Sequence, residues 1–224
     1  MQLARNEFIS DFYKIPAYTL SSPDFKTTVI VIHGYGGNKE ELLGLSFRIS
    51  ELGFNVITFD LRGHGQNINP LNIDILKDVN YLFDLKRQNG KIISIGHSLG
   101  GRLSLVSNAN VRIGISPALD RTYSDQTKTI INNLRKYRVT EIENYINWRI
   151  LNNLPVVDSS LTKSDFIIYG SRDVPEIIKY CEKLKNDGKN VIRINNALHG
   201  DIFLLEETII EISQILFPQL SRMA

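Results

Sequence analysis

The sequence has little cysteine and no long hydrophobic run, and each absence excludes a class of protein. Cys181 is the only cysteine among the 224 residues, so the chain cannot form an internal disulfide and suits a reducing compartment. No apolar run approaches the roughly 20 residues that a membrane span requires. The first residues also lack the basic and then apolar segments of a signal peptide. We therefore expect a soluble, cytoplasmic protein.

The chain also lacks an excess of charge of either sign. Its 26 lysines and arginines face 24 aspartates and glutamates, which leaves a formal net charge of +2. A surface with such balanced charge does not indicate a basic patch for nucleic acid, and no basic cluster indicates binding to a membrane surface. No set of histidine, cysteine and carboxylate side chains has the spacing of a metal site. We expect no nucleic-acid or membrane partner, no metal and no cofactor, and the oligomeric state stays open.

Apolar, β-branched runs alternate with amphipathic segments along most of the chain. Runs typical of buried strands lie at residues 27–32, 54–59, 92–95, 111–116, 164–169 and 191–194. Helical spacing of apolar residues occurs at residues 39–52, 71–87, 101–106, 176–185 and 202–216. Residues 7–20 indicate one or two edge strands, because Pro16 argues against a central position, and residues 21–24 indicate a turn. The pattern predicts an α/β protein with a mostly parallel central sheet flanked by helices.

Residues 119–160 depart from this alternation. The segment is rich in asparagine, arginine, lysine and tyrosine, and its apolar spacing predicts two or three short helices. Tyr123, Tyr137, Tyr145 and Trp148 could line a pocket, although packing within the segment is the ordinary role of such side chains. We predict a single domain over residues 1–224, with a small helical cap at 119–160 over the carboxyl edge of the sheet.

Residues 91–101 carry the most informative motif of the sequence. An apolar strand with three isoleucines runs into Gly96-His-Ser-Leu-Gly100, and residues 101–106 continue with helical spacing. A strand, a sharp turn with Gly-x-Ser-x-Gly and a helix together are typical of a nucleophile elbow. Glycines on either side of Ser98 allow the strand and the helix to pass close to each other. The sequence therefore predicts Ser98 as a nucleophile rather than as an incidental serine in a glycine-rich turn.

A serine nucleophile needs a base, and the chain order limits the choice. Around a nucleophile elbow the partners follow in the order serine, acid, histidine, and His199 is the only one of the four histidines beyond Ser98. Asp173, in the loop after the strand predicted at 164–169, is the first choice for the acid, and Asp120 is its rival. Asp165 and Asp201 are weaker candidates, because one lies at a strand start and the other suits a helix cap.

The glycine-rich residues 33–37 follow the first buried strand. They match neither phosphate-binding pattern, so we interpret them as an oxyanion loop. The backbone N–H groups of Tyr35 and of Leu99, the residue after the nucleophile, are the predicted oxyanion donors. We expect His33, Asp60 and His64 to brace their own loops rather than to act in catalysis, because all three precede the nucleophile.

The motifs HGYGG, FDLRGHG, GHSLGG, GSRDVP and ALHGD occur in an order and spacing that resemble the α/β-hydrolase superfamily over nearly the whole chain. The closest resemblance is to its small esterase and prolyl-oligopeptidase-like branch, although the loop around Asp173 is at least one residue shorter than the pattern of that branch. The resemblance implies an α/β-hydrolase fold and a Ser98–His199–Asp173 triad. It also implies a serine hydrolase that acts on a small-molecule ester through an acyl-enzyme, and the small cap favours short to medium acyl chains. A thioesterase, an amidase or a peptidase with the same triad, or a non-catalytic ligand-binding protein of this fold, remains an alternative.

Overall fold

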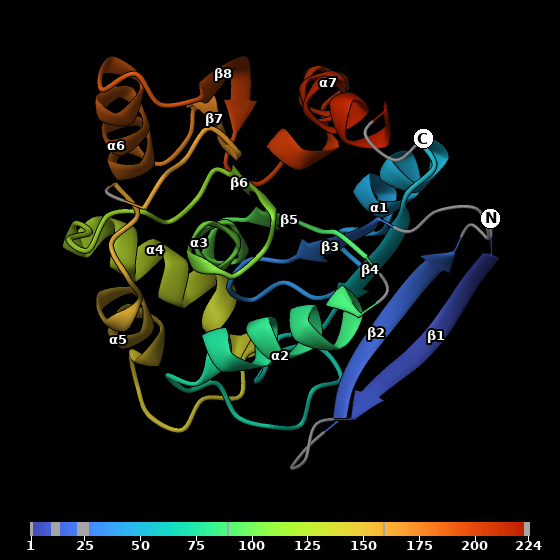
Figure 1. The fold of residues 1–224 in the computed structure, drawn as a ribbon. Helices are drawn as coiled ribbons and strands as arrows, with labels where there is room; N and C mark the ends of the chain where they lie inside the picture. Colours follow the sequence, from blue (N-terminus) through green and yellow to red (C-terminus); the bar gives the residue numbers. More distant parts are fainter. Residues whose placement is uncertain (1, 10–13, 22–26, 89, 159, 222–224) are drawn as a thin grey trace.

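The computed structural model describes residues 2–9, 14–21, 27–88, 90–158 and 160–221. In this part of the chain eight strands form one sheet in the order β1-β2-β4-β3-β5-β6-β7-β8 (Figure 1). The strands are β1 (Gln2–Ile9), β2 (Lys14–Ser21), β3 (Thr28–Ile32), β4 (Asn55–Phe59), β5 (Ile92–His97), β6 (Val111–Ile115), β7 (Asp165–Arg172) and β8 (Val191–Leu198). Strands β3 to β8 pair in parallel, whereas β1 and β2 are antiparallel to their neighbours. The predicted α/β class with a mostly parallel sheet is confirmed.

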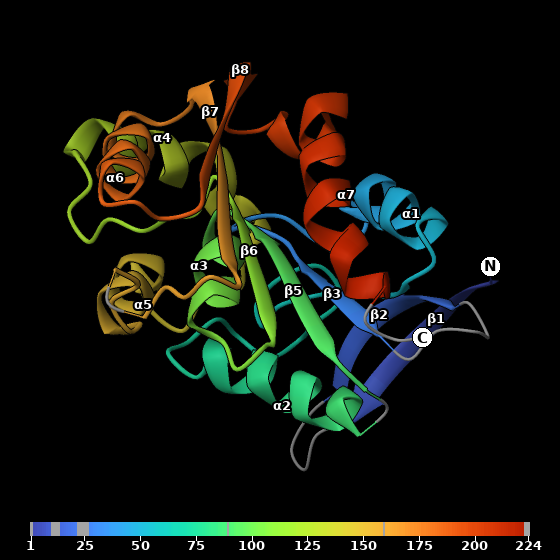
Figure 2. The same cartoon turned by 45° about the horizontal axis from the view of Figure 1, so that its top comes forward.

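Helices cover both faces of the sheet. They are α1 (Leu43–Glu51), α2 (Ile75–Arg87), α3 (Leu99–Val106), α4 (Asp125–Arg135), α5 (Ile146–Asn153), α6 (Pro175–Asn186) and α7 (Glu206–Ser221), with short 3-10 helices η1 (Lys136–Arg138) and η2 (Ile202–Leu204). Alternate residues of β3 enter different cores, since Ile30 packs with α2 and α3 while Val31 packs with α1 and α7. Figure 2 shows α1 and α7 on one side of the sheet and α2 and α3 on the other. A strand covered on both faces must be apolar throughout, which explains the sequence of β3.

The N-terminal hairpin differs from the sequence prediction in one respect. Of the two hairpin strands, β1 lies at an edge of the sheet and β2 does not, because β2 pairs with β1 on one side and with β4 on the other. Pro16 is compatible with this position because it lies just before the ladder of Ala17–Leu20 with β4, where its carbonyl accepts a hydrogen bond from the Asp60 N–H (2.9 Å). The turn predicted at 21–24 falls largely on residues 22–24, outside the described residues.

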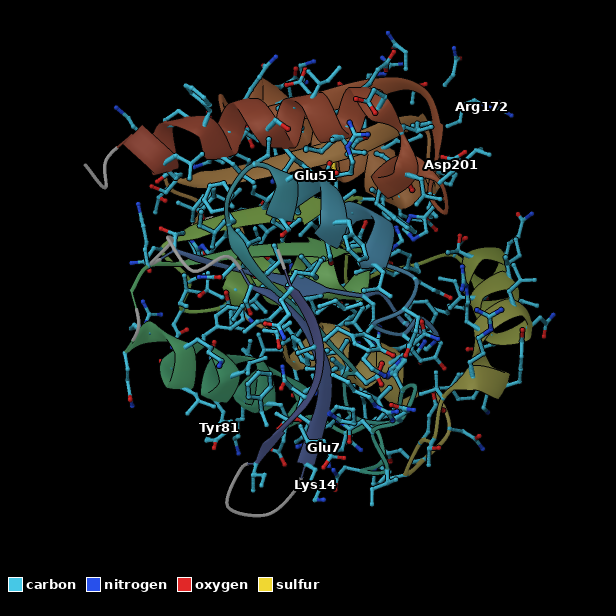
Figure 3. The ribbon with its side chains drawn as sticks, turned by 90° about the vertical axis from the view of Figure 1, so that its right-hand side faces the viewer. Glu7, Lys14, Glu51, Tyr81, Arg172 and Asp201 are labelled. Atoms are coloured by element: carbon cyan, nitrogen blue, oxygen red, sulfur yellow. The ribbon has the colours of Figure 1, made fainter. Side chains whose placement is uncertain are left out.

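Polar contacts hold β1, which forms one free edge of the sheet. Glu7 and Lys14 form an ion pair across the hairpin (3.0 Å), and the Tyr81 hydroxyl of α2 donates a hydrogen bond to the Ile9 carbonyl (Figure 3). Charged residues along an edge strand also discourage pairing with a second chain.

Two C-terminal boundaries differ from the sequence prediction. Strand β8 continues to Leu198, four residues beyond the strand predicted at 191–194, and Leu198 pairs with Arg172 beyond an irregularity in the ladder. The last helix does not end before Pro218 but runs through it to Ser221. Residues 202–204 form η2 rather than the first turn of that helix.

Residues 119–160, called the cap segment below, contain α4, η1 and α5 between β6 and β7. Two backbone hydrogen bonds join the segment to the loop after β4. The Thr140 N–H donates to the Gly63 carbonyl (2.8 Å), and the Thr140 carbonyl accepts from the Leu71 N–H (2.7 Å). It also covers the loop after β3, where a Cβ built on Gly36 would lie 2.7 Å from Arg135 Cβ. The cap segment therefore lies at the carboxyl ends of β3 and β4. Within the described ranges no helix is long and apolar enough to cross a membrane.

Candidate active site

Ser98 lies at a sharp turn between β5 and α3. Its φ of 55° and ψ of −115° are unusual for a residue with a side chain. The turn is held by hydrogen bonds, because the Ser98 N–H donates to the Ile115 carbonyl (2.9 Å) and its carbonyl accepts from the N–H groups of Arg102 (3.0 Å) and Ala118 (3.1 Å). A strained backbone that its surroundings fix in this way is common at reactive residues.

The two glycines of the motif are required by close backbone contacts. A Cβ on Gly96 would lie 2.0 Å from the Gly100 carbonyl oxygen, and a Cβ on Gly100 would lie 2.3 Å from the Ile32 carbonyl oxygen. Strand β5, helix α3 and strand β3 therefore approach each other at distances that only glycine allows. The expectation that these glycines let strand and helix pass closely agrees with this geometry.

His199 links Ser98 to Asp173. Its Nε2 lies 3.0 Å from the Ser98 Oγ, and its Nδ1 lies 2.7 Å from the Asp173 Oδ1. A carboxylate only accepts hydrogen bonds, so Nδ1 carries the proton and Nε2 presents its lone pair to the serine hydroxyl. The structure thus brings together three predicted residues that lie far apart in the sequence.

The other candidate acids have different partners. Asp120 accepts hydrogen bonds from the backbone N–H (2.9 Å) and the hydroxyl (3.0 Å) of Thr122. Asp165 pairs with Arg112 (2.6 Å) at the opposite end of β7. Asp201 accepts from the Leu198 N–H (2.8 Å) rather than from the free N–H groups of a helix. Among these carboxylates, Asp173 is the one that contacts His199.

The surroundings of Asp173 keep it ionised. Its side chain is fully buried (0% exposed), and burial alone would raise its pKa. Hydrogen bonds from His199, from the Ser116 hydroxyl and from the Val174 N–H (2.7 Å) outweigh burial and hold the pKa of Asp173 below its usual range. The carboxylate can therefore orient His199 and stabilise its protonated form near neutral pH.

His97 and Ser116 contribute to this arrangement, and sequence reasoning assigned neither a role. The His97 Nε2–H donates to the His199 carbonyl (2.7 Å), and the two rings lie 4.9 Å apart. Burial, followed by the neighbouring His199, lowers the pKa of His97 to about 3, so its ring is neutral. Ser116 has a φ of 45° and donates to Asp173. The available signals were the position of His97 beside Ser98 and that of Ser116 at the end of a predicted strand.

The predicted oxyanion donors lie beside the nucleophile. A Cβ on Gly34 would come within 3.0 Å of Ser98 Cβ, so the loop that carries Tyr35 touches the elbow. Leu99 is the first residue of α3, where a backbone N–H has no partner within the helix. In the described part of the chain neither the Tyr35 nor the Leu99 N–H donates a hydrogen bond. Both remain available to a ligand.

His33, Asp60 and His64 hold the surrounding loops. The His33 Nε2 accepts from the Leu61 N–H (3.1 Å), its Nδ1–H donates to the Gly34 carbonyl (2.8 Å), and burial lowers its pKa to about 4. Asp60 accepts from both the N–H (2.9 Å) and the ammonium (2.6 Å) of the buried Lys39. His64 packs against the ring of His33 at 5.1 Å. These contacts match the expected bracing role and keep the oxyanion loop in place.

A cavity of about 40 Å³ opens beside Ser98. Its lining comes from the elbow and the oxyanion loop, from α6 and the loop before it, and from the cap segment. The lining residues are Tyr35, Ser98, Leu99, Ala118, Tyr123, Ile131, Asn147, Trp148, Leu151, Val174, Ile177 and His199. Tyr123 and Trp148 line it, although packing within the segment was the expected role of such side chains, whereas Tyr137 (74% exposed) and Tyr145 (59% exposed) lie on the surface. In the residues that the structure describes, no group of three or more histidine, cysteine or carboxylate side chains could hold a metal ion.

A family model described as the alpha/beta hydrolase fold matches residues 27–107, which include β3, β4, β5 and the elbow. Among curated proteins, the protein phosphatase methylesterase 1 of Candida albicans is 30% identical over 112 residues, which are 45% of this chain and 31% of that protein. The putative esterase/lipase 2 of Mycoplasma pneumoniae is 24% identical over 111 residues, which are 47% of this chain and 41% of that protein. The matches therefore span less than half of the curated relatives.

Solved structures match over nearly the whole chain. Est1E from Butyrivibrio proteoclasticus has a TM-score of 0.73 and 17% identity, with 97% of this chain and 99% of the other covered. A structure from a study of carboxylesterases of the thaumarchaeon Nitrososphaera gargenis has a TM-score of 0.71 and 17% identity, with 98% and 100% covered. Identities this low show a common fold and leave the reaction to be argued from the site.

Proposed function

We propose that this chain, which has the α/β-hydrolase fold, is a serine hydrolase that cleaves carboxylic esters of short to medium acyl chains. The observation that carries the proposal is the chain of hydrogen bonds from Asp173 through His199 to Ser98 (2.7 and 3.0 Å). A serine hydroxyl is a poor nucleophile unless a base takes its proton, and this arrangement supplies the base and its orientation.

The first half of the proposed reaction acylates Ser98. The His199 Nε2 takes the hydroxyl proton as the Ser98 Oγ attacks the ester carbonyl carbon, and the carbonyl oxygen becomes an oxyanion. The Tyr35 and Leu99 N–H groups donate to this oxygen, and Asp173 stabilises the imidazolium. His199 then returns its proton to the leaving alcohol oxygen as the carbon–oxygen bond breaks. An acyl group remains on Ser98 by an ester bond.

The second half releases the acid. A water molecule attacks the acyl carbon while His199 takes one of its protons, and the same N–H groups stabilise the second oxyanion. The bond to the Ser98 Oγ then breaks, and His199 returns the proton to that oxygen. A carboxylic acid leaves and the free serine is restored, so no cofactor enters the balance.

The cavity supports a small substrate group. Its volume of about 40 Å³ and its mainly apolar lining suit a short acyl or alkyl group. We further propose that residues 119–160 act as a cap, because Tyr123, Ile131, Asn147, Trp148 and Leu151 of this segment form one wall. Ester chemistry is favoured over amide or thioester chemistry by the names of the relatives, a methylesterase and a putative esterase/lipase.

Covalent labelling with a fluorophosphonate tests the proposal directly. We expect the wild-type protein to be labelled at Ser98, as mapped by mass spectrometry of the modified peptide, and the Ser98→Ala and His199→Ala variants to stay unlabelled. A series of p-nitrophenyl esters from acetate to decanoate then measures acyl preference, and matched amides and thioesters measure leaving-group preference. Absence of labelling in folded wild-type protein would contradict the proposal and favour a non-catalytic ligand-binding protein.

A further inference from the structure

Three residues that line the cavity beside Ser98 carry buried polar atoms without a partner. Among the described residues, the Tyr123 hydroxyl, the Asn147 Oδ1 and the Trp148 Nε1 have no hydrogen-bond partner. The side chains are well enclosed, since Tyr123 is 6% and Asn147 is 4% exposed. Buried polar groups in folded proteins nearly always have partners, because an unpaired one carries the full cost of its desolvation. Because all three residues line the cavity, a ligand bound there can supply the missing partner.

The three residues form one wall of the cavity. Asn147 and Trp148 are adjacent in the first turn of α5, and Tyr123 lies shortly before α4. The Tyr123 and Trp148 rings pack together with their centroids 5.3 Å apart. Apart from the reacting groups, the remaining lining consists mainly of Ala118, Ile131, Leu151, Val174 and Ile177. A small polar group would therefore find its partners at this wall.

The types of atom define the chemistry of that group. The Trp148 N–H can only donate, the Asn147 Oδ1 can only accept, and the Tyr123 hydroxyl can do both. A carboxylate would leave the Asn147 oxygen unpaired, and an ammonium would leave the Trp148 N–H unpaired. Among the described residues, no lysine, arginine, aspartate or glutamate lines the cavity to compensate an ion. The wall thus suits a neutral group that both donates and accepts, and a hydroxyl is the smallest such group.

We propose that the natural substrate carries a hydroxyl group in the part of the ester that enters the cavity, where it pairs with Tyr123, Asn147 and Trp148. This inference rests on the proposed ester hydrolysis at Ser98 and specifies its substrate class. The hydroxyl accepts from the Trp148 N–H and donates to the Asn147 Oδ1 or the Tyr123 oxygen. An ester with a methyl group in place of the hydroxyl would leave these atoms unpaired and lose transition-state binding.

Pairs of esters of nearly equal shape test the proposal. For the acyl part, methyl 3-hydroxybutanoate is compared with methyl 3-methylbutanoate, and for the alcohol part, 2-hydroxyethyl butanoate with propyl butanoate. Acid release is followed by titration at constant pH. Within one of the two pairs we expect kcat/KM to be at least about tenfold higher for the hydroxylated ester, which corresponds to one to two hydrogen bonds. The pair that shows the preference identifies which part of the ester enters the cavity.

Variants connect the preference to the wall. We expect Tyr123→Phe and Asn147→Leu each to lower the ratio of kcat/KM for the hydroxylated ester to kcat/KM for the apolar ester about three- to tenfold. The melting temperature of Tyr123→Phe should stay equal or rise, because the variant removes a buried hydroxyl that has no partner in the fold. If the hydroxyl were needed for structure, the melting temperature of Tyr123→Phe would fall. Tyr137→Phe, at an exposed tyrosine of the same segment (74% exposed), is the control and should change neither quantity.

The outcomes separate this inference from the proposed function. Hydrolysis of both members of each pair at equal rates would overturn the inference alone and would mean that the three atoms hold water. No hydrolysis of any of the four esters would contradict the proposed function. In that case the Ser98→Ala protein is titrated with the same four esters, and the shift in its melting temperature measures how well each ester binds. Equal shifts for the two members of each pair would overturn the inference there as well.

Discussion

The His97 side chain holds the backbone of His199 rather than any reacting atom. Its Nε2–H donates to the His199 carbonyl (2.7 Å), and its ring packs against both His199 (4.9 Å) and Phe203 (4.8 Å). A base displaced by less than an ångström loses much of its efficiency, because proton transfer depends on the geometry of the donor and acceptor. His97 is thus a positioning residue for the base.

Replacement of His97 should therefore slow the reaction without abolishing it. For His97→Leu, which lacks the donor, we expect kcat on p-nitrophenyl butanoate to fall between about tenfold and a hundredfold with KM little changed. His97→Gln, whose side-chain amide can donate to the same carbonyl, should recover part of the loss. A leucine variant with the wild-type kcat, or a glutamine variant no better than leucine at equal melting temperature, would contradict the positioning role.

The three residues of the proposed triad could be predicted individually from the sequence, whereas their supporting contacts could not. Ser98 has a local motif, and His199 follows from the chain order because only one histidine lies beyond the serine. The bond between His97 and His199 joins residues 102 positions apart, and nothing in either local sequence indicates it. Ser116 is likewise identified only once β6 and β7 are placed side by side.

Gly96 and Gly44 differ in the space that surrounds them. Gly96 lies where β5 meets α3, and its Cβ would collide with the Gly100 carbonyl at 2.0 Å. Gly44 lies on the exposed side of α1, and a Cβ there meets nothing within 4 Å. Alanine at the first position strains the elbow, whereas alanine at the second improves helix propensity.

The matched variants should show this difference. We expect Gly96→Ala to lower the free energy of unfolding by about 3 kcal/mol or more, or to yield no folded protein, and to lose fluorophosphonate labelling. We expect Gly44→Ala to raise the free energy of unfolding by about 0.5–1 kcal/mol, a rise of roughly 1–4 °C in melting temperature, with labelling unchanged. A labelled, stable Gly96→Ala protein would mean that the elbow tolerates a wider turn.

Helix α4 is the least packed helix of the cap segment. None of its residues is buried, and Ile130 (49%) and Leu134 (61%) are exposed. Its start is held mainly by the Glu176 carboxylate, which accepts hydrogen bonds from the Ser124 N–H (2.8 Å) and the Thr127 hydroxyl (3.0 Å). A helix with so little buried apolar surface has little free energy opposing local opening.

Hydrogen exchange should therefore distinguish α4 from α3. We expect the backbone amides of α4 to exchange at least about a thousandfold faster than those of α3, which is buried for most of its length. Glu176→Gln should speed exchange in α4 further and leave α3 unchanged, because it weakens the bonds that hold the start of α4. Equal protection of the two helices would show that the cap segment opens only with the whole domain.

Sequence prediction succeeded where an element is covered on both sides and failed where contacts beyond the element set its end. The apolar run at 27–32 corresponds to β3 because burial on both faces demands such a sequence. By contrast, β8 continues through the polar residues Asn195 and Asn196 to Leu198, because β7 offers a partner at Arg172. Helix α7 likewise passes Pro218, which the sequence rule for proline would place beyond a helix end.

At the scale of the whole molecule, the loops beside the site contain buried neutral histidines. His33 and His64 are each 1% exposed and lie 5.1 Å apart. Burial lowers the pKa from 6.5 to about 4 for His33 and to about 3 for His64, where the charge of His33 adds to the effect. In the unfolded chain both would titrate near the ordinary value.

These shifts predict acid sensitivity with a definite sign. Between about pH 6.5 and pH 4 the unfolded chain binds protons that the folded chain excludes, so the free energy of unfolding falls as the pH falls. Burial likewise lowers the pKa of His97 to about 3, and the three histidines together contribute a slope of up to about 4 kcal/mol per pH unit near the middle of this range. That loss is large against a total stability of roughly 5–15 kcal/mol. Denaturant unfolding measured at intervals from about pH 7.5 to pH 4 gives the slope.

His64→Asn separates the histidine contribution from the general effect of protonated carboxylates. The variant keeps a side chain that can donate to the Arg62 carbonyl, as the His64 Nδ1–H does (2.9 Å), but it does not titrate. We expect the histidine contribution to its slope above pH 4.5 to be about two thirds of that in the wild type, so that the variant becomes relatively more stable as the solution is acidified. Because His33 braces the oxyanion loop, fluorophosphonate labelling of the wild type should fall over the same interval as stability. An unchanged slope in His64→Asn would mean that the acid sensitivity arises elsewhere in the molecule.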